Sequence, residues 1–366
     1  MKRFLILLLL AAGPSTADQG AFELAVDFSS GYSSNVFLDR SLEWDISLRP
    51  SLEASLDFGE FWSAGYSGEL NAYTRHDQLL SHWHELFIFL NPAWGEEGEN
   101  EFVLEASLQT LRNQPEFSAL NLLQPGLLAK LILEPKDWLR WRLSAQGIYR
   151  YFYDDNFSSS IDGWLESELS FTLPFRATIS PRAGIRGRYL PRITVGQSGQ
   201  GADRFDFQAA GGAHYSQSLG KACGLQLDYL YLVTVGKNSL LERQLTQVQF
   251  TYLGEEFLFG GHQVFGAVKV LLGKLGAISA GGRYEWRQYA GWPALDEQGA
   301  LIGADRRDQR LGPRVAFDLH WEPKKSQSHL PEITLSASYQ YLRQWSNHWW
   351  YDTSLHQAAL LLAGSW

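Results

Sequence analysis

The sequence lacks several features that mark common protein classes. One of its 366 residues is a cysteine, Cys223, so no disulfide can form within the chain. The net charge is −9 and charged residues make up only 19% of the chain, which argues against a nucleic-acid partner. No Walker A motif, dinucleotide fingerprint, CxxC pair or EF-hand pattern is present. We therefore expect no cofactor and no metal site.

Long hydrophobic runs are also missing. Beyond the N-terminus no stretch of about 18 apolar residues occurs, so no transmembrane helix is predicted. The N-terminus itself is typical of a secretory signal peptide, because Lys2 and Arg3 precede the apolar run 4–12 and small residues follow at a cleavage site. We predict a cleaved signal peptide over residues 1–17 and a mature chain over residues 18–366.

Aromatic residues, in contrast, are abundant. Trp, Tyr and Phe together reach 14% of the chain, although the mean hydropathy is slightly negative. A transmembrane β-barrel accounts for this combination. Its outer surface is apolar, its lumen is polar, and aromatic side chains gather at both membrane interfaces.

Alternation of apolar and polar residues, repeated about every 20 residues, predicts the strands. It runs without a break through residues 45–58 and recurs over residues 139–151, 177–189 and 311–321. Such alternation is longer than the strands of about five or six residues that are usual in soluble sheets. We predict an all-β fold, a single closed antiparallel transmembrane β-barrel of about 16 strands. The alternative is 18 strands, if residues 237–273 cross the membrane more than once.

The connections between the predicted strands alternate in length. Short ones fall at residues 59–61, 135–137, 174–176 and 273–276, and longer ones at residues 74–82, 113–121, 154–160, 190–204 and 291–308. Outer-membrane barrels have short periplasmic turns and longer extracellular loops. If the short connections are periplasmic, both ends of the mature chain are predicted to lie in the periplasm.

Tryptophans near these connections are predicted to form two interfacial girdles. Those near short connections are Trp62, Trp94, Trp138 and Trp321, and those near long ones are Trp286, Trp292, Trp345, Trp349 and Trp350. Stacking on sugar rings is the alternative for Trp292, Trp349 and Trp350.

Residues 31–39, Gly-Tyr-Ser-Ser-Asn-Val-Phe-Leu-Asp, are similar to the Gly-Tyr-Asp-Ser-Asn-Val-Phe signature of the outer-membrane β-barrel porins. This is a broad family, and some members accompany exopolysaccharide export. Residues 306–312 and 343–347 resemble strand starts and loop ends of the same group. Trp366, which ends an alternating strand, resembles the signal that such barrels present to their assembly machinery.

The resemblance implies an integral protein of the Gram-negative outer membrane. Its partners would be membrane lipid and the barrel-assembly machinery, which would bind the C-terminal strand. In some members of the family, polysaccharide or export-system components would be further partners.

Charges on the polar phase of the strands segregate along the chain. If the apolar phase faces lipid, the acidic residues that line the pore are Asp45, Glu53, Asp57, Glu69, Glu85, Glu101 and Glu105. The basic ones are Arg140, Arg142, Arg150, Arg182, Arg186, Arg188, Arg283, Arg287, Arg310 and Arg314. An acidic wall that faces basic walls predicts a transverse field, which sets ion preference in a pore.

The leading functional hypothesis is a porin-like channel for passive passage of small hydrophilic solutes or a secreted polymer. Barrels of 16 to 18 strands leave an aqueous lumen. The alternative is a plugged barrel, filled by salt-bridged side chains, that scaffolds surface polysaccharide or protein assembly or export. An outer-membrane hydrolase is a third hypothesis, although we expect no enzyme. The densest cluster, His76 and Asp77 with His82 and His84, lies in a predicted loop. Imidazole and carboxylate groups suit a weak zinc site, but the spacing fits no ligand motif and we expect a solvated loop.

Overall fold

The computed structural model describes residues 22–35, 43–95, 98–153, 159–195, 200–235, 259–321 and 332–365. Of residues 191–195, 200–204 and 365 the backbone alone is described. The predicted signal peptide, residues 36–39 of the porin-like signature, and Trp366 lie outside the described residues.

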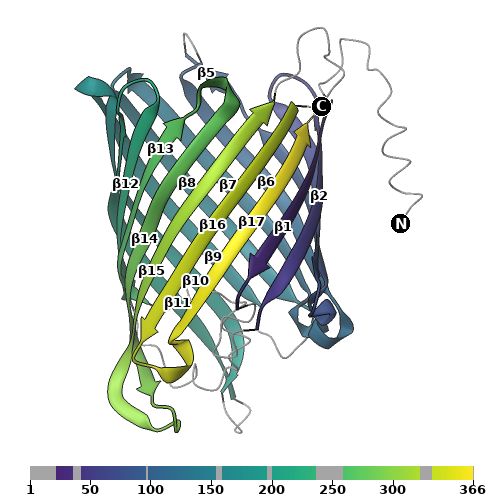
Figure 1. The fold of residues 1–366 in the computed structure, drawn as a ribbon, viewed down its shortest axis with the longest axis vertical. Coiled ribbons are helices and arrows are strands. Elements are labelled where there is room, and N and C mark those ends of the chain that lie inside the picture. The colour runs from purple at the N-terminus through teal and green to yellow at the C-terminus, as the bar shows by residue number, and fades with distance from the viewer. Residues whose placement is uncertain are drawn as a thin grey trace.

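Sixteen antiparallel strands form a closed barrel (Figure 1). The first eight are β1 (Phe22–Ser33), β2 (Asp45–Asp57), β3 (Trp62–Tyr73), β4 (Ser81–Leu90), β6 (Asn100–Asn113), β7 (Leu122–Lys136), β8 (Leu139–Phe152) and β9 (Ser160–Leu173). The other eight are β10 (Ala177–Val195), β11 (Gln200–Ser218), β12 (Cys223–Val235), β13 (Gly260–Leu271), β14 (Gly276–Leu295), β15 (Leu301–Trp321), β16 (Glu332–Ser346) and β17 (Thr353–Ser365). Each pairs with its neighbours in the sequence, and β1 pairs with β17 to close the ring. An extra two-residue strand, β5 (Ala93–Trp94), pairs with β6.

Short 3-10 turns complete the described secondary structure. They are η1 (Asp77–Leu79), η2 (Pro115–Leu120), η3 (Pro174–Arg176), η7 (Gly273–Leu275) and η9 (Trp349–Tyr351). Within the ranges given above, no helix has both the length and the apolar character needed to cross a membrane.

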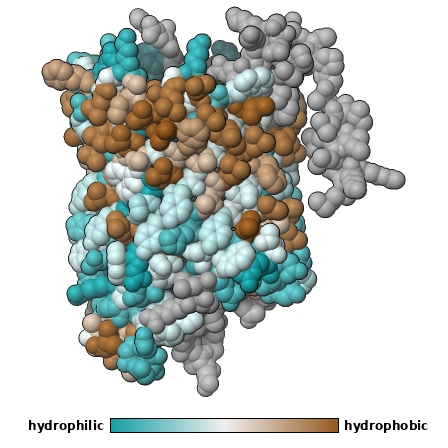
Figure 2. Space-filling view, viewed as in Figure 1, coloured by the Kyte–Doolittle hydropathy of each residue, from teal (hydrophilic) through white to brown (hydrophobic). Residues whose placement is uncertain are grey.

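The outer surface of the barrel carries the apolar phase of the alternation. In β1, Phe22, Val26 and Phe28 are exposed, and their direct partners on β2 are Leu56, Leu52 and Pro50. Directly paired residues share one face of a sheet, so the apolar face continues from strand to strand. Figure 2 shows a hydrophobic belt across the upper part of the wall, and paler, more polar side chains below it.

The two ends of the barrel differ in their connections. At one end, the top of Figure 1, β1 begins, β17 ends and short connections such as η3 and η7 join the strands. We call this the turn end. At the opposite end, the loop end, lie η1, η2, η9 and the long β14–β15 hairpin. The two kinds of connection therefore lie at opposite ends, as the sequence predicts.

The strand number of 16 is confirmed, whereas two predicted loops are wrong. Residues 190–204 and 291–308 are mostly strand, because β10 and β14 continue beyond the regular wall and pair with β11 and β15. The register shifts after Leu190 and again after Tyr289. Such bulges break the alternation of side chains while the ladder of backbone hydrogen bonds goes on, so the sequence pattern ended before the strands did.

Candidate functional site in the barrel lumen

The inward face of the wall carries the charged residues. The strand register puts every residue predicted to line the pore on this face, opposite to the exposed hydrophobic side chains. Those predictions were Asp45, Glu53, Asp57, Glu69, Glu85, Glu101, Glu105, Arg140, Arg142, Arg150, Arg182, Arg186, Arg188, Arg283, Arg287, Arg310 and Arg314. The strand register shows only that these side chains face the lumen. That they influence conduction stays a prediction.

The signs of charge segregate around the ring. Strands β2, β3, β4 and β6 carry the predicted acidic set, and β1 adds Glu23 and Asp27 on the same face. Strands β8, β10, β14 and β15 carry the basic set. In the order of the ring β14 lies opposite β6, and β10 lies opposite β1. An acidic arc of wall therefore faces basic strands across the lumen.

A chain of hydrogen bonds crosses the inner wall from β4 to β10. The Gln109 amide donates to Glu85 at 2.8 Å, and the Gln124 amide donates to Gln109 at 2.6 Å. The Arg150 guanidinium donates to Gln124 at 3.1 Å and also contacts Asp162. Asp162 in turn accepts two bonds from Arg188, at 2.8 and 2.9 Å. This chain, which we call the lumenal ladder, ties six neighbouring strands together at the inner surface.

Asp162 is the most deeply placed member of the lumenal ladder. It is 2% exposed and Arg188 is 4% exposed, so both charges have lost most of their water. A buried charge is tolerated only when it is paired and hydrogen-bonded. Here the Asp162 carboxylate forms ion pairs with two guanidinium groups, those of Arg150 and Arg188.

Other charged side chains half-way along the wall remain exposed. Arg283 on β14 contacts Glu285 at 3.1 Å but keeps 59% of its side chain exposed. Glu53 on β2 and Arg314 on β15 are also exposed on the inward face. Among the described residues, these positions leave space in the lumen for water.

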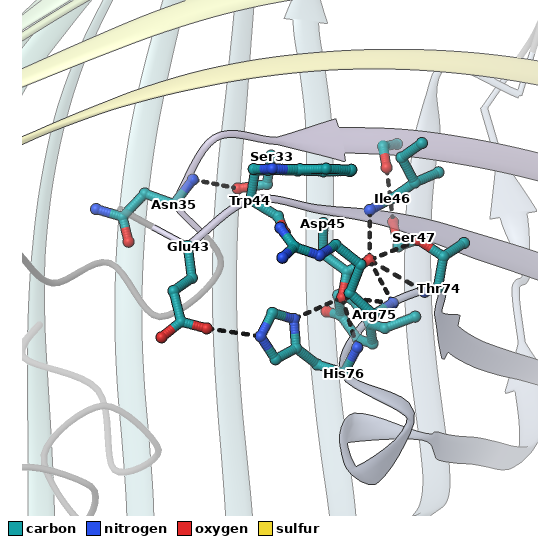
Figure 3. A network of polar contacts seen from close by, with 12 residues as sticks. Ser33, Asn35, Glu43, Trp44, Asp45, Ile46, Ser47, Thr74, Arg75 and His76 are labelled. Atoms are coloured by element: carbon teal, nitrogen blue, oxygen red, sulfur yellow. Dashed lines mark hydrogen bonds and ion pairs between the residues drawn. The ribbon is translucent and has the colours of Figure 1, made fainter. Parts of the chain in front are cut away.

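Asp45 belongs to an anchor at the loop end and not to the open surface of the lumen. Its side chain points inward but is fully buried under the β3–β4 connection (Figure 3). It accepts backbone N–H bonds from Thr74 at 3.0 Å and His76 at 2.9 Å, and a hydroxyl bond from Thr74 at 2.9 Å. The His76 ring bridges Asp45, 2.7 Å from Nδ1, and Glu43, 2.8 Å from Nε2. Asp45 thus fixes this connection on the barrel rim.

We expect the anchor to weaken as the pH rises. Contacts with the Glu43 and Asp45 carboxylates raise the pKa of His76 above its usual 6.5. A raised folded-state pKa adds stability that is fully present below about pH 6.5 and is lost as the pH rises through the folded pKa. Limited proteolysis of residues 74–80, normalised to a peptide substrate at each pH, should therefore speed up as the pH rises above about 6.5.

The His76→Gln variant should show a flat pH profile, because glutamine does not titrate. The His320→Gln variant, which changes an exposed histidine on β15, should keep the wild-type profile. Identical profiles for the wild type and H76Q would refute the role of His76.

A second buried cluster joins the β14–β15 hairpin to η9. Arg306 is fully buried, with its guanidinium carbon 4.1 Å from the ring centre of Tyr289, 5.0 Å from Trp292 and 3.3 Å from Tyr351. It donates two hydrogen bonds to Asp308, at 3.1 and 2.6 Å. We call this group the arginine cage. The prediction that Trp292 belongs to a lipid-facing girdle is wrong, because its ring packs on Tyr289 and Tyr351.

Strand β16 and its following turn complete the arginine cage. Asp308 also accepts bonds from Ser346 at 2.7 Å and Gln344 at 3.1 Å. Burial lowers the pKa of His348 to about 4, and the neighbouring Arg306 charge adds to the effect. His348 is therefore neutral near pH 7, and its Nδ1 accepts the Trp350 N–H at 3.3 Å. The sequence pattern does not predict this cluster, because its members come from segments that only the register brings together.

The predicted histidine group in the first long loop is divided by the structure. His76 lies in the β3–β4 connection, but His82 and His84 are part of β4 and face outward. The prediction of one loop cluster is therefore wrong. Among the residues that the structure describes, no three His, Cys, Asp or Glu side chains are grouped so that they could hold a metal ion.

Comparison with known proteins identifies the fold alone. No protein-family model matches the chain, and no curated protein is similar to it in sequence. Among solved structures, OccAB1 of Acinetobacter baumannii is similar with a TM-score of 0.50 and 10% identity, over 94% of this chain and 96% of that one. CdiB of Acinetobacter baumannii has a TM-score of 0.50 and 10% identity, over 93% of this chain and 60% of that one. OpdL of Pseudomonas aeruginosa has a TM-score of 0.47 and 10% identity, over 96% and 99%. The fold is that of outer-membrane β-barrels.

Proposed function

We propose that this chain forms a porin-like, water-filled channel in the bacterial outer membrane, for passive passage of small hydrophilic solutes. The observation that carries the proposal is the exposure of charged side chains half-way along the inward face, at Glu53, Arg283 and Arg314. A plugged scaffold would need these groups to be covered. Closed barrels of this strand number generally enclose an aqueous lumen.

The membrane position follows from the outer surface. Its hydrophobic belt fits a lipid environment, and the long connections at the loop end fit the extracellular side. With this orientation solutes enter past the anchor at Asp45 and the arginine cage, and leave at the turn end.

The arrangement of charge suggests how the lumen would select solutes. An acidic arc that faces basic strands makes a field across the pore, which aligns zwitterionic or dipolar solutes and discriminates among ions. The lumenal ladder holds the inner wall between β4 and β10 rigid. Nothing in the described residues couples passage to an energy source, so transport would be diffusive.

The experiment is ion selectivity in planar bilayers. Wild-type protein should give large, steady conductance steps. Arg283→Glu with Arg314→Glu should shift the preference toward cations by about 1 kcal/mol, about fivefold in the permeability ratio, because water-screened charges near 4 Å interact with about that energy. Arg307→Glu is the matched control, since Arg307 faces outward on β15 and should leave selectivity unchanged.

Two results would contradict the proposal. A folded, heat-modifiable barrel that never conducts would mean a closed lumen. Unchanged selectivity in the double variant, with normal conductance, would mean that Arg283 and Arg314 do not line the path of the ions.

A further inference from the structure

Carboxylate side chains of the strands are confined to the inward face of the wall, whereas basic side chains occur on both faces. Within the regular register, leaving out the extensions of the β10–β11 and β14–β15 hairpins, every strand aspartate and glutamate faces inward. The outward-facing arginine, lysine and histidine residues of the described strands are His82, His84, Arg112, Lys136, His262, Arg307, Arg343 and His356. All but Lys136 lie toward the loop end. The outer wall at that end therefore presents donors and positive charge, without a strand carboxylate among them.

A repeated tyrosine–histidine pair marks the height of this belt. The Tyr66, Tyr229 and Tyr339 hydroxyls each lie 2.6–2.8 Å from Nδ1 of a histidine on the next strand of the ring. In each pair the histidine is offset by two residues from the direct partner of the tyrosine, toward the loop end. Tyrosine and histidine have an apolar body and a polar tip, and such residues gather where lipid meets water. The belt is thus the outer-leaflet interface if the loop end is extracellular.

One of the three pairs is extended into a cationic cluster on β4 and β6. The Tyr66 hydroxyl bonds to Nδ1 of His84, and Nε2 of His84 lies 2.9 Å from Nδ1 of His82. If the Tyr66 hydroxyl donates to His84 and the Nε2–H of His84 donates to His82, the Nε2–H of His82 remains as a donor that points outward. His82 is exposed and is the direct partner of Arg112, whose guanidinium lies 4.2 Å from the ring centre of Tyr153. Two donors, one of them permanently charged, therefore meet on the lipid-facing wall.

Such a cluster is unfavourable on this face unless an anion meets it. From β1 to β12 the regular outward face of the described strands holds no acidic, basic or histidine side chain except His82, His84, Arg112 and the turn-end Lys136, and the remainder is mostly apolar. Charged side chains on the lipid face of a barrel are destabilising in proportion to their depth, and intramembrane ionisable groups commonly mark functional sites. The sign and height of this cluster match a phosphate group at the level of the outer-leaflet headgroups.

We propose that His82, His84 and Arg112, supported by Tyr66 and Tyr153, bind a phosphate-bearing headgroup of an outer-leaflet glycolipid. The guanidinium supplies charge-assisted hydrogen bonds to phosphate oxygens, which are roughly twice as strong as neutral ones. The histidine chain supplies a second donor at a fixed position. This site rests on the proposed membrane orientation, and it is independent of whether the lumen conducts.

A second outward arginine on the same belt offers a contrast. Arg343 on β16 contacts the Asp352 carboxylate at 2.5 Å, so its charge is met within the chain. It therefore serves as a matched control, with the same residue type on the same face and toward the same end of the barrel.

The test is lipid retention by the refolded full-length barrel in native mass spectrometry. The probes are diphosphoryl lipid A and the same lipid after enzymatic removal of both phosphates. Wild-type protein should bind the phosphorylated form about tenfold more tightly, since a hydrogen bond to a charged group contributes about that factor. The double variant His82→Gln with Arg112→Gln should lose this preference, and Arg343→Gln should keep it.

Equal binding of the two lipids by wild-type protein would overturn the proposal, and so would an unchanged preference in the double variant. Heat-modifiable migration establishes that each variant is folded, and the single variant Arg112→Gln is the fallback if the double variant is not. Because lipid retention needs no conductance, a barrel that shows the lipid preference but does not conduct would overturn the proposed channel alone.

Discussion

Replacing Asp308 with asparagine is expected to lower the free energy of unfolding by about 3–5 kcal/mol, the range for a buried ion pair that loses one partner. Arg306 would remain fully buried within its three aromatic rings while its two bonds would end on a neutral group. The aromatic contacts stabilise the desolvated cation, by about 2 kcal/mol for such a contact, but neutral rings do not replace the counter-charge.

Urea unfolding in lipid vesicles, followed by tryptophan fluorescence, measures this loss, since Trp292 packs in the arginine cage. Two variants separate charge from general damage. Asp296→Asn at the tip of the same hairpin removes a carboxylate that bonds only turn N–H groups, and it should cost about 1 kcal/mol or less. Arg306→Met combined with Asp308→Leu removes both charges and should recover most of the stability. A loss in D308N no larger than in D296N would refute the account of the cage.

The second large effect is expected at the centre of the lumenal ladder. Asp162→Asn removes the buried carboxylate that contacts both Arg150 and Arg188, and it should lower the free energy of unfolding by about 3–5 kcal/mol. It also adds one net positive charge to the basic side of the lumen, so the selectivity of any conducting channel should move toward anions. Urea unfolding and bilayer reversal potentials measure the two effects separately.

Glu166→Gln is the control for this variant. Glu166 lies on the same strand and face as Asp162 but is only half-buried. Glu166→Gln should therefore also shift selectivity toward anions, but it should lower the free energy of unfolding by less than Asp162→Asn does. If both variants lost the same stability, burial of the Asp162 pair would not be the cause.

The parts of this fold that the sequence predicts are those that depend on local periodicity. Alternation over residues 45–58 fixes which side chains share a face, because successive residues on a strand point to opposite sides. The inward direction of Glu53 and the outward direction of Leu56 follow from this pattern without knowledge of the strand partners. Turn positions such as residues 174–176 follow in the same way, since η3 occupies those residues.

Contacts that depend on register were not predictable from the same pattern. Asp45 and His76 are separated by 31 residues, and their bond requires both the β2–β3 pairing and the path of the connection that follows. The sequence pattern predicts a loop at His82 and His84, because β4 begins with Ser81, ahead of the recognisable apolar alternation. In the arginine cage, Trp292 lies beyond the bulge that follows Tyr289, where the periodicity no longer identifies the face.

The pairing of β1 with β17 has a consequence for the order of folding. Ala25 is the partner of Ser365 and Ser33 is the partner of Gln357, so the closing seam joins residues more than 300 positions apart. Contacts of such long range form late, because the entropy of closing the intervening loop opposes them. Until the seam forms, the sheet has two free edges with unpaired N–H and C=O groups, which invite association with other chains. Ring closure therefore ends the period in which a nascent molecule is prone to aggregate, and it requires the last strand of the wall to be in place.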